Sequence, residues 1–264
     1  MRHLKRIVGS IDKAILGGIL TRLYFEFVER LVIKHRSDIF NYGFKGEYIK
    51  NDNSMLNVLS DKYGSDKGQT SSKGNPYNWS SHNYADIYEL MFRLRRSDVE
   101  LLVECGIGTN DPSFVSSMGV NGKPGASLYV WKDFFPKAQI IGIVIDSNIL
   151  FEDDRITTYQ CDQTSSDSLK NFCNIASLTL SSIDIIIDDG LHEFHAGKSM
   201  FESMNKYLAL DGIYVIEDVS QSDYIPYKDY FAKLETQFTV QFVNLQRPSL
   251  SVLNNRLIVI RHNI

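Results

Sequence analysis

The sequence predicts an α/β domain with a doubly wound, mostly parallel sheet, and two patterns carry this prediction. Strand-like and helix-like patterns alternate along residues 99–264, which is typical of a parallel sheet covered by helices. Glycines and acidic residues follow several of the strand-like runs, at the edge where such sheets bind ligands. The chain of 264 residues, 43% hydrophobic and 23% charged, is long enough for one such domain and an appendage.

Apolar runs rich in valine and isoleucine predict the strands. In chain order, the predicted strands are residues 99–108, 138–146, 156–162, 183–189, 211–219, 238–245 and 255–262. The predicted helices are residues 126–135, 165–178 and 193–208. Only a short connection joins the last two strands, so one of them should run antiparallel.

Residues 1–36 predict one or two amphipathic helices, because their apolar residues recur at helical spacing. This segment has eight Lys and Arg residues and three acidic residues, whereas the whole chain has a net charge of −4. Its longest uncharged run, residues 14–21, is too short to span a bilayer. Two interpretations stay open: a helix on a membrane surface, and a helix packed on the domain or on a second subunit, which is the plainer of the two.

The charge and the cysteines limit the possible functions. A negative net charge argues against a general nucleic-acid binder, which is usually basic. Cys105, Cys161 and Cys173 are an odd number with no C-x-x-C pair, which indicates reduced cysteines in a cytosolic protein. We therefore expect a cytoplasmic protein, with peripheral contact at the inner membrane face if the N-terminal helix binds lipid.

A glycine-rich turn, "ECGIGT" (104–109), follows the first predicted strand. Two glycines two positions apart let the backbone turn tightly and approach a ligand. A dinucleotide-binding turn would have a third glycine at position 111, where this chain has Asp111. The turn therefore favours a nucleoside ligand without phosphates, and S-adenosylmethionine is such a ligand.

Acidic residues and a histidine follow two consecutive predicted strands. Asp189 ends one strand, and Glu217 and Asp218 end the next. If these strands are neighbours, they lie about 4.8 Å apart, and the three carboxylates meet at one edge. Three unpaired anions would raise each other's pKa, and a hard divalent ion such as Mg²⁺ would remove that conflict. His192 is the candidate general base, since an ordinary histidine has a pKa near 6.5.

Several motifs together resemble class I S-adenosylmethionine-dependent methyltransferases. They are "LLVECGIGT", "ITTYQCDQ", "DIIIDDGLHEFH" and "DGIYVIEDV". The pair "DDGLH" and "IEDV" resembles, more narrowly, the sugar O-methyltransferases of macrolide tailoring and of bacterial capsule and surface-polysaccharide pathways. "DKYGSDKG" (61–68) and "HNYADIYELMF" (82–92) resemble their leader segment.

This resemblance implies a seven-stranded, Rossmann-like methyltransferase fold with antiparallel last strands. The domain that binds S-adenosylmethionine and carries out catalysis would be residues 99–264. Residues 58–98 would be a leader or lid segment, and residues 1–57 a helical appendage outside the resemblance.

The resemblance also implies roles for individual residues. Asp189, Glu217 and Asp218 would bind the metal, and Asp189 and His192 would be catalytic, with His192 as the general base. The residues expected to bind S-adenosylmethionine are Glu104, Gly106, Gly108, Thr109, Asp146, Asp162, Gln163, Asp188, His82 and Tyr88. One departure is Val144, where relatives often have the acid that binds the ribose. Asp146, two residues later, is the candidate for that role.

The expected function is that of an S-adenosylmethionine-dependent, divalent-metal-assisted O-methyltransferase. It would act on a sugar hydroxyl, in capsule or surface-glycan biosynthesis, on an acceptor with vicinal hydroxyls. We expect a homo-oligomer that does not bind nucleic acid. Two alternatives stay open: a macrolide-sugar or catechol-type O-methyltransferase, and a non-catalytic binding protein with the same fold. The histidine in "DDGLH" favours a sugar acceptor, because catechol methyltransferases usually use a lysine as the base.

Overall fold

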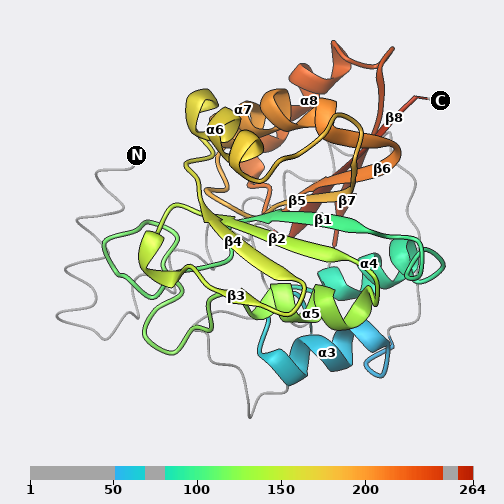
Figure 1. Ribbon diagram of the computed structural model, residues 1–264. Helices are drawn as coiled ribbons and strands as arrows, with labels where there is room; N and C mark the ends of the chain where they lie inside the picture. The colour runs from blue at the N-terminus through green and yellow to red at the C-terminus, as the bar shows by residue number, and fades with distance from the viewer. Residues whose placement is uncertain (1–50, 69–80, 246–254, 264) are drawn as a thin grey trace, which may run out of the picture. The chain divides into compact units, whose positions relative to one another are not determined.

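The computed structural model describes residues 51–68, 81–245 and 255–263 (Figure 1). All of them belong to one compact unit, Lys50–Ile264. The amphipathic helices expected in residues 1–36, and any membrane or subunit contact through them, lie outside the described residues. Among the described residues, we find no helix with the length and apolar character that crossing a membrane requires.

One sheet of eight strands forms the centre of this unit, counted over the described residues. The strand order is β3-β4-β2-β1-β5-β6-β8-β7. The strands are β1 (Leu101–Cys105), β2 (Gln139–Val144), β3 (Glu152–Asp153), β4 (Ile156–Gln160), β5 (Ile183–Asp188), β6 (Leu208–Ile216), β7 (Phe238–Asn244) and β8 (Arg256–His262). The central strands are parallel, and β8 is antiparallel to both of its neighbours. The predicted mostly parallel sheet is confirmed. The two-residue β3 is an eighth strand that no apolar run predicts.

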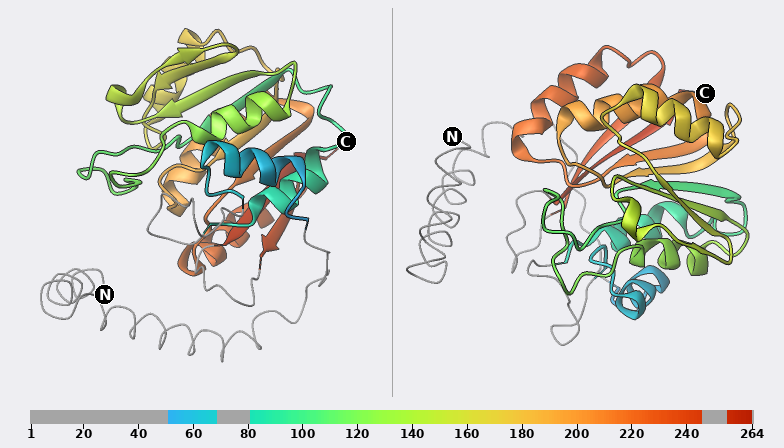
Figure 2. Two further views of the ribbon diagram at one scale, coloured as in Figure 1. Left: turned by 90° about the horizontal axis from the view of Figure 1, so that it is seen from below. Right: turned by 60° about the vertical axis from the view of Figure 1, so that its left-hand side comes forward.

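Helices cover both faces of the sheet (Figures 1 and 2). One layer contains α3 (Met55–Tyr63), α4 (Tyr84–Phe92) and α5 (Ala126–Phe134), and the other contains α6 (Ser166–Ile175), α7 (Phe194–Met204) and α8 (Gln221–Ala232). Successive strand residues point to opposite faces. Leu102 and Ile185 therefore pack in the core under α3–α5, whereas Val103 and Ile186 pack in the core under α6–α8.

Local signals set the ends of the helices. At the start of α3, the Ser54 side chain accepts a hydrogen bond from the backbone N–H of Asn57, and Gly64, with a φ of 77°, ends the helix. The sequence patterns do not predict α8, because Pro226 lies inside it and proline normally interrupts a helix. The packing of Tyr227 and Phe231 in the core outweighs that local preference.

The strand ends position the loops that follow them. β1 ends at Cys105 rather than at residue 108, because Gly106 and Gly108 have φ angles of 88° and 86° that an extended strand cannot have. β5 pairs in parallel with both β1 and β6, so the strands before "DDGLH" and "IEDV" are neighbours. The carboxyl ends of β1, β5 and β6 consequently meet at one edge of the sheet.

Candidate active site

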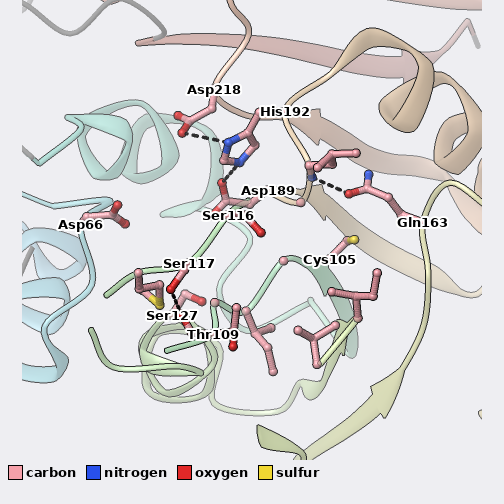
Figure 3. Close-up of a pocket in the computed structure, with 18 of the residues that line it drawn as sticks. Asp66, Cys105, Thr109, Ser116, Ser117, Ser127, Gln163, Asp189, His192 and Asp218 are labelled. Atoms are coloured by element: carbon pink, nitrogen blue, oxygen red, sulfur yellow. Dashed lines mark hydrogen bonds and ion pairs between the residues drawn. The ribbon is translucent and has the colours of Figure 1, made fainter. Parts of the chain in front are cut away.

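A cavity of about 550 Å³ lies at this edge of the sheet (Figure 3), a volume typical of small-molecule sites. The turns after β1 and β5 line it together with residues 65–67 and His82 of the leader segment. Nine of the residues expected at the site line this cavity: His82, Gly106, Gly108, Thr109, Asp162, Gln163, Asp189, His192 and Asp218. Val144 and Ile145 add an apolar surface.

Gly106 lets the turn after β1 touch the turn after β5. A Cβ atom at position 106 would lie 2.0 Å from the backbone oxygen of Asp189, and the φ of 88° is itself unfavourable for other residues. The backbone N–H of Asp189 also donates to the carbonyl of Cys105. The glycine therefore fixes the position of Asp189 at the wall of the cavity.

Lys67 lies in the middle of the acidic residues. Its Nζ is 2.5 Å from Asp189 Oδ2 and 2.7 Å from Glu217 Oε2, and it is 3.3 Å from Glu104 Oε1. Only 4% of its side chain is exposed. Asp189 and Glu217 are therefore not the unpaired anions that the sequence predicts, because a lysine of the leader segment pairs with both.

Two tyrosines of α4 complete this network. Tyr88 donates a hydrogen bond of 2.5 Å to Glu217 Oε1, and Tyr84 donates one of 2.6 Å to Asp218 Oδ1. Both rings are fully buried. Glu217 thus has one oxygen bonded to Tyr88 and the other to Lys67, and it is buried behind the cavity wall.

His192 lies between two carboxylates (Figure 3). Its Nε2 is 3.1 Å from Asp189 Oδ1, and its Nδ1 is 3.6 Å from Asp218 Oδ2. One ligand atom from each of these three residues lies within 4.8 Å of the others. The structure therefore brings Asp189 and Asp218 together with His192, and it turns Glu217 towards Lys67 and Tyr88.

The charges change the protonation of this group. Burial alone would lower the pKa of His192, but the carboxylates of Asp218 and Asp189 outweigh burial and raise that pKa to about 10. Burial likewise opposes ionisation of Asp189, but Lys67 and His192 lower its pKa to about 2. Without a bound cation, His192 is consequently protonated at neutral pH.

Asp188 and Gln163 are hydrogen-bonded to each other, and Gln163 is also hydrogen-bonded to the turn that carries Asp189 and His192. Gln163 Nε2 donates to Asp188 Oδ1 at 2.9 Å, and Gln163 Oε1 accepts from the backbone N–H of Leu191 at 2.6 Å. Burial raises the pKa of Asp188 to about 6, and its Oδ2 has no hydrogen-bond partner among the described residues. Asp188 points away from the cavity, so it positions the turn instead of lining the site.

Asp146 and Glu104, two further expected site residues, are hydrogen-bonded to neighbouring residues. Asp146 Oδ2 accepts from Thr109 Oγ1 at 2.5 Å, and its Oδ1 accepts from the backbone N–H of Asn148. Glu104 is buried and accepts from Ser127 Oγ and Trp131 Nε1. In the part of the chain that the structure describes, Glu104, Tyr88, Asp146, Asp188 and Glu217 lie behind the residues that line the cavity.

The sequence patterns do not identify Lys67 as a site residue. It belongs to "DKYGSDKG", the leader motif of the resemblance, so that motif was the available signal. Its partners Asp189 and Glu217 are 122 and 150 residues away in the chain, and no local pattern predicts such a contact.

The chain is similar in sequence to curated O-methyltransferases. The chain is 29% identical over 168 residues to the 8-demethyl-8-alpha-L-rhamnosyl tetracenomycin-C 2'-O-methyltransferase of Streptomyces olivaceus, covering 64% of this chain and 38% of that enzyme. It is 30% identical over 139 residues to the mycinamicin VI 2''-O-methyltransferase of Micromonospora griseorubida, covering 52% of this chain and 32% of that enzyme. No family model matches the chain.

A solved structure supports the fold. The MycE methyltransferase from the mycinamycin pathway, in complex with Mg, SAH and mycinamycin VI, superposes with a TM-score of 0.56 at 21% identity. The match covers 79% of this chain and 54% of MycE.

These comparisons confirm the class I methyltransferase fold and the resemblance to sugar O-methyltransferases of macrolide and tetracenomycin tailoring. The chain spans less than two fifths of the length of these two curated relatives. The resemblance to capsule and surface-polysaccharide enzymes finds no support in them and stays a prediction.

Proposed function

We propose that this protein transfers the methyl group of S-adenosylmethionine to a sugar hydroxyl, with help from a divalent metal ion. One observation carries the proposal: a histidine and two carboxylates from neighbouring strand ends, His192, Asp189 and Asp218, converge on a cavity that begins at a glycine turn. Such a group can hold a hydroxyl and accept its proton. The relatives named above are O-methyltransferases that act on sugars.

The cavity suits S-adenosylmethionine. Gly106 and Gly108 line the cavity with backbone, because a side chain at these positions would collide with Asp189 or Met118. Val144 and Ile145 offer an apolar surface for the adenosine. Asp162 at the end of β4 can accept hydrogen bonds from the nucleoside. The cofactor would carry the activated methyl group, bonded to a sulfonium that these acidic surroundings favour.

The acidic group also fits a divalent cation. Three carboxyl groups, those of Glu104, Asp189 and Glu217, contact a single lysine, and Asp218 lies beside His192, so the carboxyl groups outnumber the lysine that pairs with them. Asp189 and Asp218 would hold the ion, with Glu217 beside them, and oxygen ligands suit Mg²⁺. When bound, the ion would acidify and orient two neighbouring hydroxyls. MycE has been solved with Mg bound.

His192 would act as the base. Its protonation at neutral pH depends on Asp189 and Asp218, so a cation held by these carboxylates would lower its pKa and make the imidazole available. The acceptor oxygen would then attack the methyl carbon as the carbon–sulfur bond breaks, and His192 would take the hydroxyl proton. Gly106, Gln163 and Asp188 would keep the turn of His192 in place.

The proposed acceptor is a sugar, and the kind of molecule that carries this sugar is a separate question. The relatives act on sugars attached to antibiotics, whereas the sequence alone favoured a capsule or surface glycan. A catechol acceptor fits less well, because the group facing the carboxylates is a histidine. A non-catalytic binding protein would not need a complete set of carboxylates and base.

Transfer of labelled methyl groups tests this function. Purified protein would be incubated with labelled S-adenosylmethionine and a panel of deoxysugar glycosides, nucleotide sugars and catechols, with Mg²⁺ or with a chelator. We expect label in a sugar with vicinal hydroxyls, and less label with the chelator. Label only in catechols would contradict the sugar proposal, and equal transfer with the chelator would contradict the role of the metal.

A further inference from the structure

The structure contains a cation of its own within the acidic group, the ammonium of Lys67. We propose that Lys67 is a positioning residue that holds Asp189 and Glu217 in place before any divalent ion binds, and that it thereby fastens the leader segment to the site. The part of this inference that concerns the ion rests on the proposed function, whereas the part that concerns assembly does not.

The position of Lys67 is fixed by its own backbone. The carbonyl of Lys67 accepts a hydrogen bond of 2.8 Å from the backbone N–H of Ala85, at the start of α4. The carbonyl of Asp66 accepts a hydrogen bond of 2.7 Å from the backbone N–H of His82. A Cβ atom on Gly68 would lie 2.4 Å from Ser60 Cβ, so the turn packs closely on α3. The ammonium group is therefore directed into the carboxylates by a rigid turn.

Lys67 takes one oxygen of Asp189 and leaves the other. It contacts Oδ2, while Oδ1 faces His192. On Glu217, Lys67 takes Oε2 and Tyr88 takes Oε1. Residues of the leader thus contact both carboxylate oxygens of Glu217. They contact only Oδ2 of Asp189, so Oδ1 stays directed at His192 and the cavity.

This arrangement predicts what happens when the lysine is removed. Breaking a buried ion pair by deleting one partner leaves uncompensated buried charge, which is strongly destabilising. In Lys67→Met, Asp189, Glu217 and Glu104 would lose their shared cation. A divalent ion would then be needed to hold the carboxylates together, and it would stabilise the variant more than it stabilises the wild type.

Thermal unfolding of the full chain tests this inference, in chelator and in millimolar Mg²⁺. We expect the Tm of Lys67→Met in chelator to fall by on the order of 10 °C, and Mg²⁺ to raise it more than it raises the wild-type Tm. Lys62→Met is the matched control, because Lys62 Nζ pairs with Asp133 at 2.9 Å on the surface, with 55% of its side chain exposed. It should lose about 1 °C or less, with no dependence on Mg²⁺.

A double variant keeps the test decisive if Lys67→Met folds poorly. Glu217→Gln removes a buried carboxyl that Lys67 contacts at 2.7 Å and that would be left without this cation in Lys67→Met. Lys67→Met/Glu217→Gln should therefore fold, and unfold at a higher Tm than Lys67→Met alone. No recovery in the double variant, or a Tm of Lys67→Met in chelator equal to that of the wild type, would overturn the proposal. An equal effect of Mg²⁺ on Lys67→Met and wild type would overturn the part that concerns the ion. A wild type without methyl transfer would refute the proposed function alone, since the chelator comparison does not use activity.

Discussion

His192 Nδ1 lies 3.6 Å from Asp218 Oδ2, and both residues have left-handed backbones, with φ angles of 57° and 53°. Such a conformation costs a residue other than glycine roughly 1–2 kcal/mol, so the surrounding contacts must impose it. Asp218 is held by Tyr84, and the turn of His192 is held by Gln163. The two side chains therefore face each other in a geometry that the fold sets before a ligand binds.

Replacing His192 tests its role as the base. Asparagine tolerates a left-handed backbone better than most residues, so His192→Asn should keep the turn while removing the proton acceptor. We expect methyl transfer to fall by about 10²- to 10⁴-fold, with S-adenosylmethionine binding retained. His195→Asn is the control, because 63% of the His195 side chain is exposed. Equal activity of the two variants would contradict the assignment.

Gly106→Ala should disturb both turns of the site. The new Cβ atom would lie 2.0 Å from the Asp189 oxygen, so we expect a lower Tm and a loss of S-adenosylmethionine binding, measured by calorimetry. Gly119→Ala is a matched control, since Gly119 also has a positive φ, of 73°, but nothing lies within 4 Å of its Cβ position. If both variants bind the cofactor equally well, the close contact is not what shapes the site.

Asp188→Asn should stabilise the protein at alkaline pH. Burial raises the pKa of Asp188 from 3.8 to about 6, so the folded state binds its proton more tightly than the unfolded state does. The cost of ionising the buried carboxyl is therefore absent below about pH 3.8 and fully present above about pH 6. We expect the Tm of the variant to exceed that of the wild type by on the order of 5 °C at pH 8, and to match it near pH 4. Asp154→Asn, at a side chain that is 80% exposed, should change neither value.

The ion-free protein should lose stability as the pH rises through the titration of His192. Its pKa is raised from 6.5 to about 10, because Asp218 and Asp189 stabilise the charged form. That stabilisation is complete below about pH 6.5 and disappears as the pH passes about 10. We expect the Tm in chelator to fall over this range in the wild type and to fall less in His192→Asn. Parallel curves would show that His192 does not carry this charge.

The mostly parallel sheet, and the meeting of Asp189 and Asp218 at one of its edges, were predictable from the sequence. Apolar runs that end in "DDGLH" and "IEDV" indicate parallel strands with polar carboxyl ends, and β5 and β6 are indeed neighbours. The direction of each side chain was harder to predict. Asp188 lies two residues after Ile186 and shares its face under α6–α8, so the alternation of the strand turns Asp188 away from the cavity.

Contacts between distant segments could not be predicted. Lys67, Tyr84 and Tyr88 reach the carboxylates across more than 120 residues of chain. The packing of α4 and of the turn after α3 against the edge of the sheet decides which oxygen each of them bonds to. The eighth strand, α3 and α8 also lie outside the predicted elements. The local patterns of β3 and α8 are weak, because β3 has two residues and α8 contains Pro226.

Calorimetric titration of S-adenosylmethionine into the wild-type protein would show whether the cavity after β1 holds this cofactor. We expect saturable binding with a dissociation constant between about 1 μM and 1 mM, the range usual for enzyme substrates, and a loss of that binding in Gly106→Ala. Absence of binding at millimolar cofactor, or binding that Gly106→Ala leaves unchanged, would contradict this expectation.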